Sequence, residues 1–132
     1  MPRLCAIVLP LFLCMAFVQV HSQTDQNVFD SGTSFYDACA LAESLGDNPT
    51  RTDAFNSGMC IGFVTGVVLG NAGTESAFNI KPSERLICLP EKSTRIQEIR
   101  VVRKYISDHP ETAHQPAVVL VIKALHGAFP CK

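Results

Sequence analysis

Apolar residues recur at helical spacing in four stretches of the chain, and no stretch alternates apolar and polar residues as a strand would. The first stretch follows Ser31, which can cap a helix, and reaches a glycine stop at Gly46. The second begins at Thr52 or Asp53, and its apolar stripe consists of Met59, Cys60, Phe63, Val64, Val67 and Val68. The pattern predicts an all-α bundle of four main helices, with a short extra turn of helix near His109.

The third and fourth stretches lie in the C-terminal half of the chain. Ser93 or Thr94 can cap the third helix, and Thr94 with Gln97 resembles a capping box. Its apolar face comprises Ile99, Val102, Tyr105 and Ile106, and its basic side chains, expected on a solvated face, are Arg100, Arg103 and Lys104. Pro116 fits the first position of the fourth helix. That helix is apolar nearly all round over residues 117–128, which predicts a place in the middle of the domain.

Four glycines of the second stretch, Gly58, Gly62, Gly66 and Gly70, are spaced four residues apart on one ridge of the predicted helix. An interior glycine destabilises a helix by about 1 kcal/mol relative to alanine, so a ridge of four indicates close approach of another backbone. We expect a tight helix contact inside the domain, with a homodimer seam as the alternative. The apolar stretch 59–69 has only 11 residues, so we expect it to be too short to span a membrane.

Residues 71–82 are predicted to form a long loop after this helix, because helix–helix connections usually have about 2–8 residues. This loop is the candidate partner-binding segment. Its side chains for hydrogen bonding are Thr74, Glu75, Ser76 and Asn79, and Phe78 could serve as an aromatic anchor. The alternative is that Phe78 and Ile80 fold back onto the core, so that the loop only spans the end of the bundle.

The first residues have the pattern of a secretory signal peptide. Arg3 precedes an uncharged apolar run from Leu4 to Val20, and small residues at Val20 and Ser22 form a cleavage site. A membrane anchor is the alternative, but the run is at the short limit for spanning and Pro10 interrupts it.

We therefore expect a signal peptide at 1–22, a flexible segment at 23–30 and one domain at 31–132. The mature chain of about 110 residues is expected to be exported, with no membrane attachment after cleavage.

Four cysteines remain after cleavage, namely Cys39, Cys60, Cys88 and Cys131. An even number in a small exported chain predicts two disulfides, whereas zinc sites need closely spaced pairs and a catalytic thiol must stay unpaired. If neighbouring helices are antiparallel, the first two cysteines lie level across one hairpin and the last two meet at the open end of the other. The layout predicts the pairs Cys39–Cys60 and Cys88–Cys131, hence a disulfide-stapled bundle.

Charge and chemistry narrow the function classes. The chain has 11 basic and 12 acidic residues, a balance that excludes a basic nucleic-acid binder and an acidic disordered tail. His109 and His114 are five residues apart, but only Asp108 and Glu111 lie near them, so we expect helix-end contacts and no metal site. No nucleophile, phosphate-loop or zinc-protease motif is present, which predicts a non-enzyme without a cofactor.

Four motifs, taken in order and spacing, resemble the Tai/Rap immunity-protein family of Gram-negative bacteria. They are Cys60-Ile61-Gly62-Phe63-Val64-x-Gly66, Cys88-Leu89-Pro90, Tyr105-x-x-x-His109-Pro110-Glu111-x-x-His114-x-Pro116-Ala117 and Ala124-Leu125-x-x-Ala128-Phe129-Pro130-Cys131. The resemblance covers residues 32–131, nearly the whole mature chain.

The resemblance implies a small periplasmic helical protein. It also implies an immunity protein that binds a peptidoglycan amidase effector of type VI secretion and blocks its active-site cleft, often as a homodimer. The matching motif residues resemble scaffold and do not identify the inhibitory surface. The alternative function is that of a periplasmic stress or chaperone-like protein with no effector partner.

Overall fold

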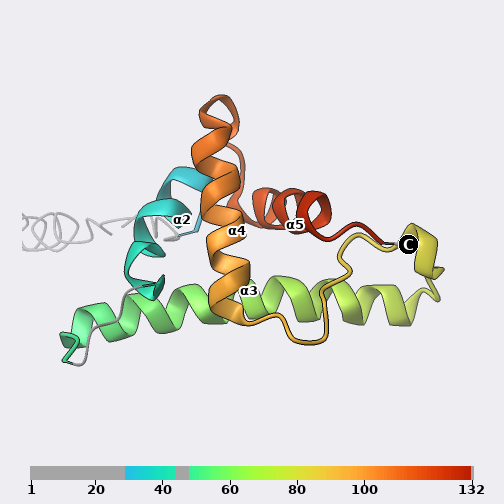
Figure 1. Cartoon of the computed structure of the whole chain (residues 1–132), viewed down its shortest axis with the longest axis horizontal. Helices are drawn as coiled ribbons and strands as arrows, with labels where there is room; N and C mark the ends of the chain where they lie inside the picture. Colours follow the sequence, from blue (N-terminus) through green and yellow to red (C-terminus); the bar gives the residue numbers. More distant parts are fainter. Residues whose placement is uncertain (1–28, 44–47, 132) are drawn as a thin grey trace, which may run out of the picture.

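The structure is a computed structural model that describes residues 29–43 and 48–131, and in these residues it contains four α-helices and no strand (Figure 1). The predicted all-α fold is confirmed. The predicted signal peptide and the Gly46 stop lie outside the described residues. The α-helices are α2 (Gly32–Ala38), α3 (Arg51–Ala77), α4 (Arg95–Asp108) and α5 (Ala117–Ala128), and the 3-10 turns are η2 (Ala40–Glu43), η3 (Pro82–Glu84) and η4 (Pro110–Thr112).

Side-chain caps determine where three of the helices begin. Ser31 forms a capping box with Ser34, and Thr94 accepts a hydrogen bond from the Gln97 N–H, as the sequence predicts. Helix α3 begins at Arg51, slightly earlier than predicted, because a capping box forms between Thr50 and Asp53. Pro116 is the cap residue of α5, one position before its predicted place.

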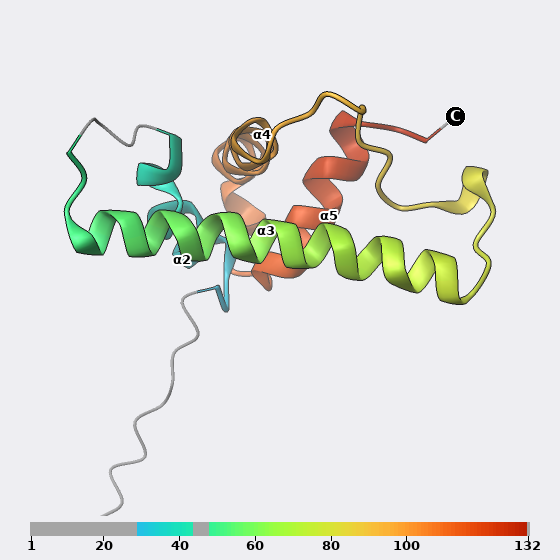
Figure 2. The ribbon, with the colours of Figure 1, turned by 90° about the horizontal axis from the view of Figure 1, so that it is seen from below.

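The other helices lie on one side of α3. In Figure 1, α3 runs along the base of the molecule, α4 crosses it, and α2 and α5 lie on opposite sides of α4. Figure 2, seen from below, shows α3 in front of the other three helices. Helices α2, α4 and α5 each contact α3 and one another. The fold is therefore a single layer of short helices packed across one long helix.

The core fills the space between this layer and α3. Its largest fully buried apolar side chains are Phe35, Ile99, Leu120, Leu125, Val64, Val102 and Val121. Phe29 extends this core, because its ring stacks on Phe63 at 4.5 Å between ring centroids. The expected central position of α5 is only partly confirmed: five of its residues are buried, but Val118 and Val119 are exposed.

Both predicted disulfides are confirmed. Cys39, at the end of α2, is bonded to Cys60 in α3, and Cys88, before α4, is bonded to Cys131 after α5. The cysteines of the first disulfide are 21 residues apart in sequence, and those of the second are 43 apart. Disulfides that close loops of this size typically stabilise a domain by about 2–4 kcal/mol.

The basic face of α4 is less solvated than predicted. The side chain of Arg103 is only 17% exposed and lies over the Tyr36 ring, with its guanidinium carbon 4.3 Å from the ring centroid. It also donates to Glu43 at 2.6 Å and to the Tyr36 carbonyl at 3.2 Å. Arg103 therefore joins α4 to α2 and η2, while Arg100 and Lys104 remain exposed.

The predicted tight contact of the glycine ridge inside the domain is wrong. Gly58, Gly62, Gly66 and Gly70 are exposed, and a Cβ atom built on any of them would meet nothing within 4 Å. The physical reason is one-sided packing. The buried residues of α3 are Ser57, Cys60 and Val64, which lie on the face opposite the ridge.

The membrane expectation also needs correction. Helix α3 has 27 residues and, by length and composition, is long and apolar enough to cross a membrane. The prediction considered only the apolar stretch 59–69, whereas the helix continues without a charged residue to Thr74. The disulfide at Cys60 nevertheless ties α3 to α2, so one face of the helix is occupied by the domain.

Alanine substitutions at two glycines, one in a crowded site and one in an exposed site, should have opposite effects on stability. In Gly32→Ala the new Cβ would overlap the buried Leu120 and lie 3.0 Å from the Ala113 carbonyl oxygen, so we expect a loss of about 1–3 kcal/mol. Gly62→Ala meets no atom and should stabilise α3 by up to about 1 kcal/mol. Urea unfolding of both variants measures the difference. Equal changes in the free energy of unfolding would contradict the difference in packing between Gly32 and Gly62.

Candidate functional site

The predicted loop at 71–82 is wrong over its first half, because α3 continues to Ala77. Two side-chain contacts support this last part of the helix. Asn71 donates to Glu75 at 2.7 Å, and the Thr74 hydroxyl donates to the Gly70 carbonyl at 2.9 Å. Residues 74–86, comprising the end of α3, the reversal after it and η3, are called the tip below. In Figure 1 the tip lies at the end of α3 farthest from α2.

The chain reverses at Asn79. Asn79 has φ 52°, the left-handed conformation that asparagine adopts more readily than most residues. The Ile80 N–H donates to the Glu75 carbonyl and the Asn79 N–H to the Ser76 carbonyl, which is the Schellman arrangement at a helix end. Pro82 then starts the η3 turn. Asn79, with Pro82 three residues later, is a signal for the end of a helix, and the loop prediction did not take it into account.

Phe78 is the most exposed large apolar side chain in the described residues, at 74%. The alternative in which it folds back onto the core is therefore wrong for Phe78, whereas Ile80 is partly buried. Aromatic residues on protein surfaces are often binding anchors, since they bury a large area at small entropic cost.

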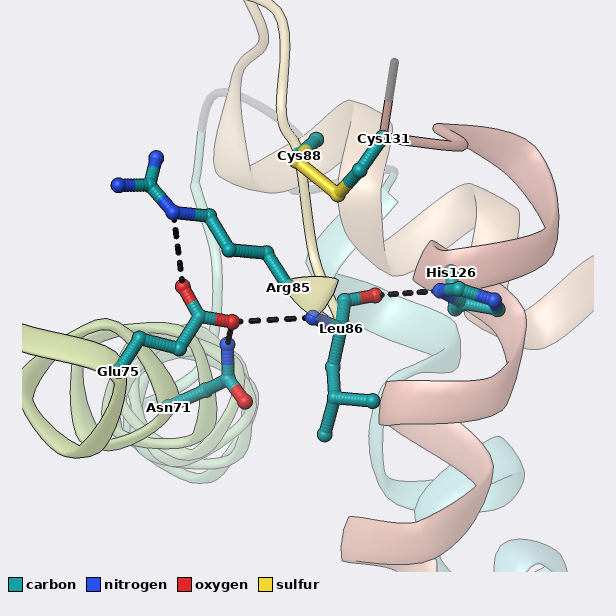
Figure 3. A network of polar contacts seen from close by, with 7 residues as sticks. All are labelled: Asn71, Glu75, Arg85, Leu86, Cys88, His126 and Cys131. Carbon is teal, nitrogen blue, oxygen red and sulfur yellow. Dashed lines mark hydrogen bonds and ion pairs between the residues drawn. A yellow bond between two sulfur atoms is a disulfide. The ribbon is translucent and has the colours of Figure 1, made fainter. Parts of the chain in front are cut away.

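Behind Phe78, a network of polar contacts attaches the tip to the rest of the domain (Figure 3). Glu75 Oε1 accepts hydrogen bonds from Asn71 and, at 3.0 Å, from the Leu86 N–H. Its Oε2 lies 3.8 Å from Arg85 Nε. The Leu86 carbonyl lies 2.7 Å from His126 Nδ1 on α5. The network therefore runs from α3 through the returning chain to α5.

The network assigns Glu75 a structural role. Its side chain is only 12% exposed, and both carboxylate oxygens have partners within the domain. The sequence predicts it as a partner contact, but it positions the tip. Sequence reasoning missed Arg85, Leu86 and His126. Leu86 takes part through its backbone, so its side chain gives no signal of this contact.

The remaining predicted residues divide between two hollows. A hollow of about 550 Å³ at the tip has Ser76 and Asn79 in its wall, together with Lys81 and Arg85. A separate apolar groove of about 540 Å³ lies between α3 and α5, and Thr74, Gly70 and Val118 are among the residues that line it. The structure thus brings Ser76 and Asn79 together and places Thr74 on a different surface.

His109 makes local contacts at the end of α4. His109 packs on Tyr105, with ring centroids 4.5 Å apart, and its Nδ1 lies 3.2 Å from Glu111. The pKa of Glu111 is lowered, chiefly by a backbone hydrogen bond and then by His109. Across residues 29–43 and 48–131, no three histidine, cysteine or carboxylate side chains are grouped to hold a metal ion.

Comparison with known proteins gives one match. The sequence model of a family described as Rap1a immunity proteins matches residues 31–131, from the Ser31 cap to the last disulfide cysteine. No curated protein and no solved structure matches the chain.

The network predicts how the tip responds to substitution. Glu75→Ala leaves the Leu86 N–H without its acceptor, so we expect a loss of about 1–3 kcal/mol and faster amide exchange at Leu86. Glu84→Ala is the matched control. Its side chain is 60% exposed and has only a 4.0 Å ion pair with Lys81, so stability should change by less than about 0.5 kcal/mol. Similar losses in both variants would contradict the structural role of Glu75.

Proposed function

The chain belongs to the Rap1a immunity proteins, and on this premise we propose that it is an exported binding protein that blocks a peptidoglycan amidase effector of type VI secretion. The observation that carries the proposal is the tip, where Phe78 is exposed at the end of a long helix. A protruding apolar side chain on a well-anchored helix end suits insertion into the cleft of a partner.

The anchoring of the tip supports this role. Binding loses affinity when a flexible segment must become ordered, so a segment that is ordered beforehand binds more tightly. Here Glu75 and His126 hold the returning chain through both backbone groups of Leu86. Ser76 and Asn79, which flank Phe78 in sequence, line the hollow at the tip and could supply hydrogen-bonding groups near the anchor.

The location and mode of action form part of the proposal. Disulfides persist in oxidising compartments, so two disulfides in so small a domain support export to the periplasm of a Gram-negative cell, directed by the signal peptide pattern at 1–22. We further propose that the protein acts by binding alone. All four cysteines of the described domain are in disulfides, which leaves no thiol nucleophile there.

The exposed ridge of α3 supports the homodimer seam that the sequence left as an alternative. Val64 is the middle residue of α3. Along the sequence, Gly58 and Gly70 are equally far from Val64, and so are Gly62 and Gly66. An antiparallel pair of α3 helices related by a two-fold axis would place glycine opposite glycine at both levels. The helix axes could then approach more closely than the usual separation of about 8–10 Å.

The exposed apolar face also bears on the alternative function. Phe55, Met59 and Leu69 are exposed on α3, as a chaperone-like protein for unfolded chains would require. Suppression of the aggregation of an acid-denatured client, without binding to any amidase, would favour that alternative over immunity.

Phe78→Ala should weaken binding to the proposed amidase effector by about 30-fold or more, a loss of about 2 kcal/mol, because the anchor is removed. Phe55→Ala is the matched control, since it removes a phenyl ring that is 65% exposed near the other end of α3. Calorimetric titration of both variants measures the affinities. Unchanged affinity in Phe78→Ala, or equal losses in both, would refute the tip as the binding surface.

The dimer proposal predicts that Gly66→Leu yields a folded monomer. The side chain has open space within one copy but would separate two paired helices, so the melting temperature of the monomer should not fall. Gly127→Leu, at an exposed glycine on α5 where a built Cβ also meets nothing within 4 Å, should leave the dimer intact. Analytical ultracentrifugation would detect the change. A monomeric wild-type protein, or a Gly66→Leu dimer, would exclude the seam.

A further inference from the structure

The two disulfides differ in their exposure to solvent. Cys39 and Cys60 are both fully buried, with no exposed surface. Cys88 and Cys131 are both partly exposed. A reducing thiolate must reach a sulfur atom directly, so access largely decides which disulfide of a folded protein is reduced.

The accessible bond is located where it affects the tip. Cys88 is two residues after Leu86, in the segment that connects η3 to α4 (Figure 3). Besides the disulfide, this segment is attached by the two hydrogen bonds of the Leu86 backbone, by the Arg85–Glu75 ion pair, and by the packing of Ile87 and Leu89 on the core. Within the described part of the chain, the disulfide is the one covalent cross-link between this segment and the end of α5.

We propose that the Cys88–Cys131 disulfide is a reducible lock on the tip, opened by a dithiol reductant while Cys39–Cys60 stays closed. A thiolate of the reductant attacks one sulfur of the pair, breaks the S–S bond and releases the other cysteine as a thiolate, which takes up a proton. The second thiol of the reductant then loses its proton, closes its own disulfide and releases the first cysteine. The protein gains two electrons and two protons, and the dithiol is oxidised.

Opening the lock loosens the returning chain. Without the bond, only non-covalent contacts of residues such as Leu86, Ile87 and Leu89 hold Cys88 near the end of α5, so the segment samples more conformations. The N–H group of Leu86 then leaves Glu75 more often, and Phe78 is held less rigidly at the surface. The fold around α3 remains, because Cys39–Cys60 is shielded from the reductant.

The first test needs no partner. The folded mature protein is treated with millimolar dithiothreitol, free thiols are alkylated at intervals, and labelled cysteines are identified by peptide mass. Cys88 and Cys131 should be labelled more than about 100-fold faster than Cys39 and Cys60, which require unfolding to react. Amide exchange at Leu86 should rise at least about tenfold after partial reduction, with no change at Val64. Equal labelling rates, or unchanged exchange at Leu86, would overturn the proposal.

Variants then test the connection to binding, which rests on the proposed function. Cys88→Ser with Cys131→Ser should reproduce the exchange of the reduced protein and bind the amidase at least about tenfold more weakly. Cys39→Ser with Cys60→Ser is the matched control for loss of a disulfide, and its Leu86 exchange should match the wild type. If the lock opens but amidase affinity is unchanged, its link to binding is refuted. If neither redox state binds an amidase, the proposed function fails and the lock stands.

Discussion

The buried residues of α3 lie in one stripe, and the Cys39–Cys60 disulfide is part of that stripe. Ser57, Cys60 and Val64 are its buried residues, and they occupy little more than two turns near the middle of a 27-residue helix. The short helices therefore meet the long one centrally. The glycine face of α3 stays exposed and its C-terminal end extends into the tip, so the two candidate interaction surfaces follow from the same packing arrangement.

Local signals in the sequence identified most of the fold. Ser31 and Thr94 begin helices because their hydroxyl groups accept backbone N–H groups a few residues away, an interaction contained within one short segment. The disulfide pairing followed from helix lengths and short connections alone. Asn79 also carried a local signal, but its left-handed conformation is optional, and a run of small polar residues before it resembled a loop.

What the sequence could not predict depends on contacts between distant residues. Periodicity shows which residues share a face of a helix, but it does not say which face is covered, and so the glycine ridge was assigned to the interior. Arg103 was assigned to solvent because Tyr36 and Glu43 are more than 50 residues away in sequence. The sequence favours a partner contact for Glu75, because the group that bonds to it is the backbone N–H of Leu86, which no side chain reveals.

The order of the disulfides along the chain has a consequence for biogenesis. The four cysteines of the described domain are bonded in consecutive pairs, the first with the second and the third with the fourth. A chain that crosses a membrane from its N-terminus exposes Cys39 and Cys60 before the other two. An oxidase that joins cysteines in their order of emergence would therefore form both native bonds directly, and maturation would not require a disulfide isomerase.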